Sequence, residues 1–158
     1  MVISEDCPQS EEFKDQSFIE AYKSAIDLYG LVHSRFILSP RGMELMKKKY
    51  LFGAFGVCPR TSCNSQNAIP VGLDDYLSAA KVKIYCPKCE DIYIPKKKIA
   101  ELDGAFFGKS FPQVFLQTYP DLVPVSGPQP FLPKAFGFKL YGLKGSAYDK
   151  SSSMIKPW

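Results

Sequence analysis

Four of the five cysteines fall into two close pairs, a pattern that is typical of a metal site. Cys58 and Cys63 have four residues between them, Cys86 and Cys89 have two, and 22 residues separate the pairs. Zinc is held by four thiolates in a tetrahedron, and each pair can supply two of them from one tight turn. The spacing predicts a zinc ribbon, in which two such turns on facing hairpins hold one structural Zn²⁺ ion.

The alternative is that the four cysteines are simply buried or joined in disulfides. The segment Met1–Asp6 is acidic and lacks the apolar stretch of a secretory signal, and no apolar run has the length of a membrane span. We therefore expect an intracellular protein of the cytoplasm and nucleus that does not bind membranes. Thiols stay reduced in those compartments, which favours metal binding over disulfides.

Catalysis is not expected from these residues. Four protein ligands leave no open position on the metal for water or substrate, which disfavours a zinc enzyme. The only histidine, His33, lies in a predicted helix, and the segment from Gly104 to Ser110 falls one residue short of a phosphate-binding loop. Asp74 and Asp75 are expected in a solvated connection, and Cys7 is expected to be a free thiol.

The charge distribution leaves a second interpretation open. The net charge is +4, the first 20 residues are mostly acidic, and lysine triplets occur at 47–49 and 96–98. Such runs usually form a solvated face, and no stacking aromatic residues alternate with them, so binding to nucleic acid is not expected. A basic zinc ribbon is nevertheless compatible with a transcription-type protein, whose nucleic-acid affinity would fall steeply with salt.

Two helices are predicted before the cysteines. From about Asp15, apolar residues recur at steps of three and four and share one face of a predicted helix; they are Phe18, Tyr22, Ala25, Tyr29, Val32 and Phe36. Further apolar residues widen this surface and predict a helix buried on more than one side; they are Ile19, Ile26, Leu28 and Leu31. Gly30 lies inside this helix and costs about 1 kcal/mol relative to alanine, unless another element packs closely there.

A second helix is predicted after Ser39-Pro40, which is typical helix-start chemistry. Met43, Met46 and Tyr50 form its inner face, and it is expected to end near Gly53.

From Gly53 onward the sequence no longer shows helical periodicity. Residues 82–85 and 91–94 alternate at period two on either side of Cys86 and Cys89, which predicts a short hairpin. Residues 103–119 predict short helical turns on the zinc module, and the prolines of 120–133 predict an extended linker.

The sequence thus predicts an α+β fold with a short helical segment, a four-cysteine zinc-ribbon module and an extended C-terminal tail. The expected parts are a flexible acidic arm (1–14), the helical segment (15–53), the zinc-ribbon dimerisation module (54–120), and the proline-rich linker with a docking tail (121–158).

Several separate segments, in order, resemble the regulatory (beta) subunits of casein kinase II. They are residues 28–38 with Arg41-Gly42, Cys58-Pro59-Arg60-Thr61-Ser62-Cys63, Ile69-Pro70-Val71-Gly72, Val82-Lys83-Ile84-Tyr85-Cys86-Pro87-Lys88-Cys89, residues 103–108 and residues 133–139. The resemblance runs from about Ser17 to about Lys139. It implies a non-catalytic subunit that stabilises a serine/threonine kinase and modulates its activity and its choice of protein substrates.

The resemblance also implies partners. Members of this family form a homodimer through their zinc modules, and the dimer holds two catalytic (alpha) subunits in a heterotetramer. Two aromatic residues of the C-terminal segment dock on the kinase, and here they correspond to Phe136 and Phe138 on either side of Gly137. Phe136, Phe138 and Leu140 are expected to alternate along an extended segment, while Lys139 and Tyr141 face the other way. We count Lys139 and Tyr141 among the docking residues. From spacing alone, both phenylalanines could equally fold back into the chain's own core.

Three positions match the family's dimer contact: Pro59, Thr61 and Ile92. Thr61 departs from the usual apolar residue, so we expect it to affect the strength of the dimer. Family members have a longer N-terminal helical domain with a dense acidic loop, and this chain begins near the penultimate helix of that domain. Regulation through that loop is therefore not expected. Ser4 and Ser10, each followed by acidic residues, faintly resemble the family's autophosphorylation site.

Overall fold

The structure is a computed structural model that describes residues 15–96 and 98–142. The acidic arm, with Cys7, Ser4 and Ser10, lies outside these residues. The helices are α1 (Gln16–Phe36), α2 (Pro40–Leu51) and α3 (Phe111–Thr118), and the strands are β1 (Ile69–Val71), β2 (Lys83–Tyr85), β3 (Ile92–Tyr93), β4 (Lys134–Ala135) and β5 (Phe138–Lys139). Short 3₁₀ turns are η2 (Thr61–Cys63), η3 (Lys98–Glu101), η4 (Gly104–Phe106) and η5 (Pro120–Leu122). Helices and small antiparallel sheets together make the predicted α+β fold.

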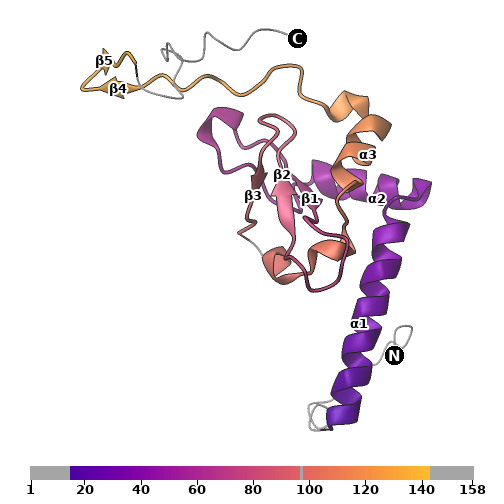
Figure 1. The fold of residues 1–158 in the computed structure, drawn as a ribbon. Helices are drawn as coiled ribbons and strands as arrows, with labels where there is room; N and C mark the ends of the chain where they lie inside the picture. The colour runs from indigo at the N-terminus through magenta and orange to yellow at the C-terminus, as the bar shows by residue number, and fades with distance from the viewer. Residues whose placement is uncertain (1–14, 97, 143–158) are drawn as a thin grey trace.

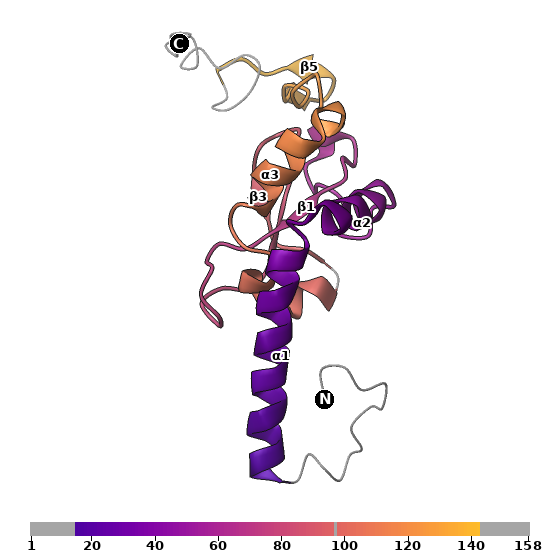
Figure 2. The ribbon, with the colours of Figure 1, turned by 90° about the vertical axis from the view of Figure 1, so that its right-hand side faces the viewer.

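The first helix begins as predicted but is not buried as predicted. The Asp15 side chain caps α1 by accepting a hydrogen bond from the Ser17 backbone N–H at 3.0 Å. However, Leu28, Tyr29 and Val32 are each more than half exposed, so the expectation of burial on more than one side is wrong. The reason is visible in Figures 1 and 2, where α1 projects from the body and only its C-terminal part lies against it. Among the described residues, no helix has the length and apolar character to cross a membrane.

Gly30 is the point where α1 meets the body. It is buried, and a Cβ atom at this position would overlap the ring of Phe106 in η4. One turn later, Nδ1 of His33 lies 2.9 Å from the backbone carbonyl oxygen of Phe106, within hydrogen-bond distance. Another element therefore packs closely at Gly30, and the His33 side chain takes part in the same contact.

The second helix matches its prediction. The Ser39 hydroxyl accepts a hydrogen bond from the Gly42 backbone N–H at 3.2 Å, and Pro40 occupies the first turn of α2. Met43, Met46 and Tyr50 are buried, and the helix ends at Leu51. Because these three residues lie on one side of the helix, α2 packs on the core with that side.

The sheet contains the predicted hairpin and one strand more. β2 and β3 pair antiparallel, with Ile84 opposite Tyr93, and β1 pairs with the other edge of β2, with Ile69 opposite Tyr85. The strand β1 was not predicted, because its three residues are all buried and show no alternation. The order β1-β2-β3 places β2 in the middle of the sheet, and Cys86 follows directly after this strand.

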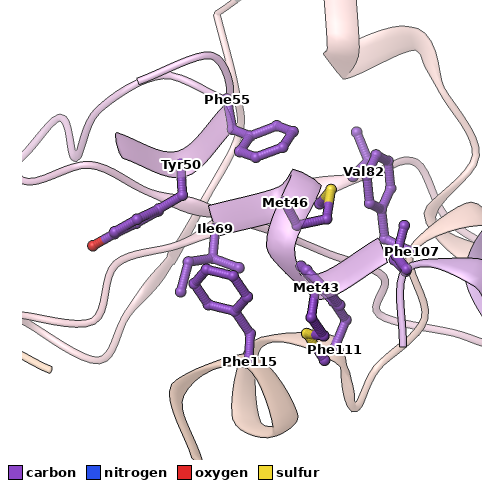
Figure 3. Packing of buried hydrophobic residues seen from close by; sticks show 10 residues of the cluster. Met43, Met46, Tyr50, Phe55, Ile69, Val82, Phe107, Phe111 and Phe115 are labelled. Atoms are coloured by element: carbon purple, nitrogen blue, oxygen red, sulfur yellow. The ribbon is translucent and has the colours of Figure 1, made fainter. Parts of the chain in front are cut away.

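The main core joins α2, α3 and β1. Figure 3 shows the side chains of α2 and α3 meeting around Ile69 of β1. The Phe115 ring packs edge-on against Tyr50 at 5.6 Å between centroids, and Tyr119 packs against Phe115 at 5.3 Å. The buried members of this core are Ile37, Met43, Met46, Tyr50, Phe55, Ile69, Val82, Phe107, Phe111 and Phe115. The aromatic segment 103–119 thus packs on the sheet as predicted.

The C-terminal segment ends the described chain in a hairpin. β4 and β5 pair antiparallel, with Ala135 opposite Phe138. Phe136 and Gly137 make the turn, and both have positive φ, 51° and 86°. Two positive φ values are the hallmark of the two-residue turns that suit a hairpin, and glycine adopts them without strain. The expected alternation is therefore wrong for Phe136, because it occupies the turn and not a strand.

Candidate metal centre

Four cysteines from two turns of the chain converge on one point. Cys58 follows the isolated bridge between Val57 and Asn67, Cys63 ends η2, Cys86 follows β2, and Cys89 lies in the turn before β3. The four Sγ atoms all lie within 4.8 Å of one another. The structure thus brings together all four residues that the sequence spacing selected.

The distances suit a tetrahedron of sulfurs around one ion. The Sγ atoms of Cys58 and Cys89 are 3.8 Å apart. In a four-thiolate zinc site the Zn–S distance is about 2.3 Å, which gives a tetrahedron edge of about 3.8 Å. A disulfide requires about 2.05 Å between sulfurs. All four cysteines are free thiols, so the geometry fits shared coordination and not a disulfide.

Backbone hydrogen bonds hold the two turns in place. In the first turn, the Arg60 N–H donates to Cys58 Sγ at 3.4 Å, and the Cys63 N–H donates to the Arg60 carbonyl at 3.0 Å. In the second, the Glu90 N–H donates to the carbonyl of Cys86 at 2.9 Å. These bonds hold the peptides beside Cys58, Cys63 and Cys86 in place.

The protonation of the thiols reflects their surroundings. Burial raises the pKa of the Cys86 thiol to about 11 and raises the pKa of Cys63 further. Burial also acts to raise the pKa of Cys89, but hydrogen bonds from the Tyr93 hydroxyl and the Asp91 backbone outweigh it and lower that pKa to about 7. A bound cation deprotonates its thiol ligands outright, so a metal at this site would override the effect of burial on Cys86 and Cys63.

Tyr93 belongs to this cluster and was missed from the sequence. Its hydroxyl oxygen lies 3.3 Å from Cys89 Sγ, and its ring packs against the buried cysteines. Nearby, the Arg60 guanidinium pairs with the Asp91 carboxylate at 3.4 Å, which ties the first turn to the second. The available signal was the position of Tyr93 four residues after Cys89, on the strand that leaves the second turn.

The other predicted functional residues lie elsewhere on the surface. Pro59, Thr61 and Ile92 are all exposed on the ribbon around the cysteines. Of the three, Pro59 lines a hollow of about 240 Å³, together with Val57 and Ile94. Phe136 and Phe138 are 101% and 77% exposed on the β4–β5 hairpin, so within the described chain neither folds back into the core.

The geometry of the cysteine cluster agrees with the comparison of this chain with known proteins. The family model described as casein kinase II regulatory subunit matches residues 1–139. The chain belongs to the casein kinase II regulatory subunit family. Family membership and the four-cysteine cluster thus confirm the resemblance found in the sequence.

Individual relatives lead to the same family assignment. Casein kinase II subunit beta' of Drosophila melanogaster is 50% identical over 129 residues, which cover 81% of this chain and 59% of that relative. Casein kinase II subunit beta of Schizosaccharomyces pombe is 45% identical over 156 residues, or 98% of this chain and 64% of the relative. Casein kinase II subunit beta of Dictyostelium discoideum is 45% identical over 137 residues and is matched over 50% of its length. The chain therefore spans about half to two thirds of the length of these relatives.

Proposed function

We propose that this chain is a non-catalytic regulatory subunit of a casein kinase II-type serine/threonine kinase. It would assemble as a homodimer, hold the catalytic subunits and modulate their activity and choice of substrate. Membership of the regulatory subunit family supports this function, and so does the four-cysteine cluster. Because four thiolates complete the shell of a zinc ion, the centre suits a structural role.

The proposed role of Cys58, Cys63, Cys86 and Cys89 is to hold one Zn²⁺ ion per chain. A bound zinc ion would cross-link the two turns that carry the sulfurs and would not take part in catalysis. Structural zinc contributes about 10–16 kcal/mol of apparent binding free energy in small finger peptides, and that energy is also folding energy. The small cysteine cluster is separate from the main core, so it gains most from such a cross-link.

The proposed dimer contact is the exposed face of the ribbon with Pro59, Thr61 and Ile92. Two further apolar residues, Val57 and Ile94, are 45% and 71% exposed beside them. Apolar side chains that cluster on a surface favour association, because burial removes them from water. Thr61 brings a hydroxyl to this face, and leaving it without a hydrogen bond would cost about 1–3 kcal/mol. The domain boundaries given above are part of this proposal.

The proposed kinase-docking element is the β4–β5 hairpin with Phe136, Phe138, Lys139 and Tyr141. One observation carries the proposal: two large aromatic side chains stand fully or mostly exposed at the tip of a hairpin, next to a linker rich in proline. Exposed phenylalanines are costly in water and become favourable when a partner's pocket encloses them. Figure 1 shows the hairpin held away from the body, where a partner could reach it.

A pull-down with the kinase catalytic subunit tests this function. The tagged chain is expected to capture the catalytic subunit, and zinc is measured on the same eluted sample. Absence of capture by a folded, zinc-loaded chain would contradict the docking role. A chain that captures the kinase but contains no metal would contradict the zinc assignment alone.

A further inference from the structure

Among the described residues, Tyr93 is a side chain from outside the set of four cysteines that contacts a predicted zinc ligand. Its hydroxyl oxygen lies 3.3 Å from Cys89 Sγ, and both groups are partly buried. A cysteine bound to a metal is a thiolate and carries no proton. In the loaded centre the hydroxyl of Tyr93 must therefore be the donor and the sulfur the acceptor.

Cys89 is the predicted ligand that a hydrogen-bond donor would protect most. Cys58, Cys63 and Cys86 are buried, whereas Cys89 is only partly buried. A more exposed thiolate is more open to chelators, alkylating agents and oxidants, because reactivity follows thiolate character and access. The ring of Tyr93 packs against the cysteine cluster, so this residue also limits access to the sulfur.

We propose that Tyr93 is a positioning residue of the metal centre: it donates a hydrogen bond to the Cys89 thiolate, holds that sulfur in place and reduces its reactivity. The inference rests on the proposed zinc site. Groups that hydrogen-bond to metal ligands orient them and tune the metal, and their loss costs about 10–100-fold in metal affinity.

The contact can be removed without disturbing the backbone. Cys58 receives its hydrogen bond from the backbone N–H of Arg60, which substitution cannot delete. The bond to Cys89 comes from a side-chain hydroxyl, and Tyr93→Phe removes that oxygen alone. Tyr50→Phe is the matched control, since its partly buried hydroxyl accepts a hydrogen bond from Gln66 Nε2 at 3.0 Å and not from a cysteine.

The experiment compares the zinc-loaded wild-type chain with Tyr93→Phe and Tyr50→Phe. Zinc affinity is measured by competition with a chromogenic chelator. Alkylation by iodoacetamide is followed by peptide mapping, which reports each cysteine separately. Tyr93→Phe is expected to weaken zinc affinity about 10-fold, the lower end of the range, because the Asp91 backbone and the Arg60 side chain still interact with Cys89. It is also expected to accelerate alkylation at Cys89 more than at Cys58, whereas Tyr50→Phe changes neither ratio.

The outcomes separate this inference from the function on which it rests. Unchanged zinc affinity and unchanged alkylation of Cys89 in Tyr93→Phe would overturn the positioning role. Equal weakening by Tyr50→Phe would also overturn it, because general loss of stability would then be the cause. A wild-type chain without bound zinc would instead overturn the proposed zinc site itself.

Discussion

The ring of Phe106 lies against the backbone of α1 at Gly30 and leaves no space for a side chain. This contact joins the projecting helix to the rest of the molecule. The hydrogen-bond contact between His33 Nδ1 and the carbonyl of Phe106 lies one turn further along the same helix. Both contacts attach α1 to the body, from which the rest of the helix projects (Figure 1).

Gly30→Ala is expected to destabilise the chain although alanine favours helices. The added Cβ would overlap the Phe106 ring, and overpacking costs about 1–3 kcal/mol. The gain in helix propensity is about 1 kcal/mol, so we expect a net loss of up to about 2 kcal/mol in the free energy of unfolding. Urea unfolding with excess zinc measures it.

The double variant Gly30→Ala/Phe106→Ala is the control for this contact. If the ring causes the clash, the two changes are not additive, and the second recovers part of the loss caused by the first. An increase in stability on Gly30→Ala alone would mean that α1 does not pack at this position.

Phe115→Ala is expected to be among the most damaging core substitutions. Phe115 is 1% exposed and contacts the rings of Tyr50, Phe111 and Tyr119. Truncation of a buried phenylalanine costs about 3–5 kcal/mol, through lost burial and the cavity left behind. Phe52→Ala is the matched control, because Phe52 is 92% exposed and its loss should change the unfolding free energy by about 0.5 kcal/mol or less. Similar effects of the two substitutions in thermal unfolding would argue against the core in Figure 3.

Phe138→Ala is expected to weaken binding to the kinase catalytic subunit while the dimer persists. An aromatic anchor contributes about 2 kcal/mol or more, which corresponds to about a 30-fold increase in Kd. Titration calorimetry measures the affinity, and light scattering measures the dimer. Phe131→Ala is the control, because Phe131 is 58% exposed in the linker and not in the hairpin. Equal affinities for wild type and Phe138→Ala would remove the docking proposal.

Features of this fold could be predicted from the sequence where neighbouring residues determine them. The start of α1 near Asp15, the cap at Ser39, the buried face of α2 and the β2–β3 hairpin follow from neighbouring residues, so they were predicted. The cysteine cluster was predicted because ligand spacing is constrained by the metal. In contrast, β1 was missed since it holds Pro70 and is buried throughout, and period-two alternation cannot identify such a strand.

Errors arose where the answer depends on distant parts of the chain or on the geometry of a turn. Apolar periodicity in α1 shows that a face could be buried, but it does not show whether the chain provides a cover for it. The hydroxyl of Tyr93 reaches Cys89 only because β3 turns back toward the second cysteine pair. Phe136 was placed in a strand because the positive φ at Phe136-Gly137 is a property of the folded turn.

Cys86→Ser is expected to abolish zinc binding and the dimer together. Cys86 is completely buried in the cluster, and a serine hydroxyl is a poor replacement for a thiolate at a four-sulfur site. Cys7→Ser is the control, because the predicted site does not include Cys7. Elemental analysis gives the zinc content, and light scattering gives the mass. A Cys86→Ser chain that remains a zinc-loaded dimer would contradict the site.

Native mass spectrometry of the wild-type chain, before and after treatment with a strong chelator, tests the central claim most directly. The account predicts a dimer that carries about one zinc ion per chain and separates into monomers when the metal is removed. A metal-free chain that is still folded and dimeric would contradict it.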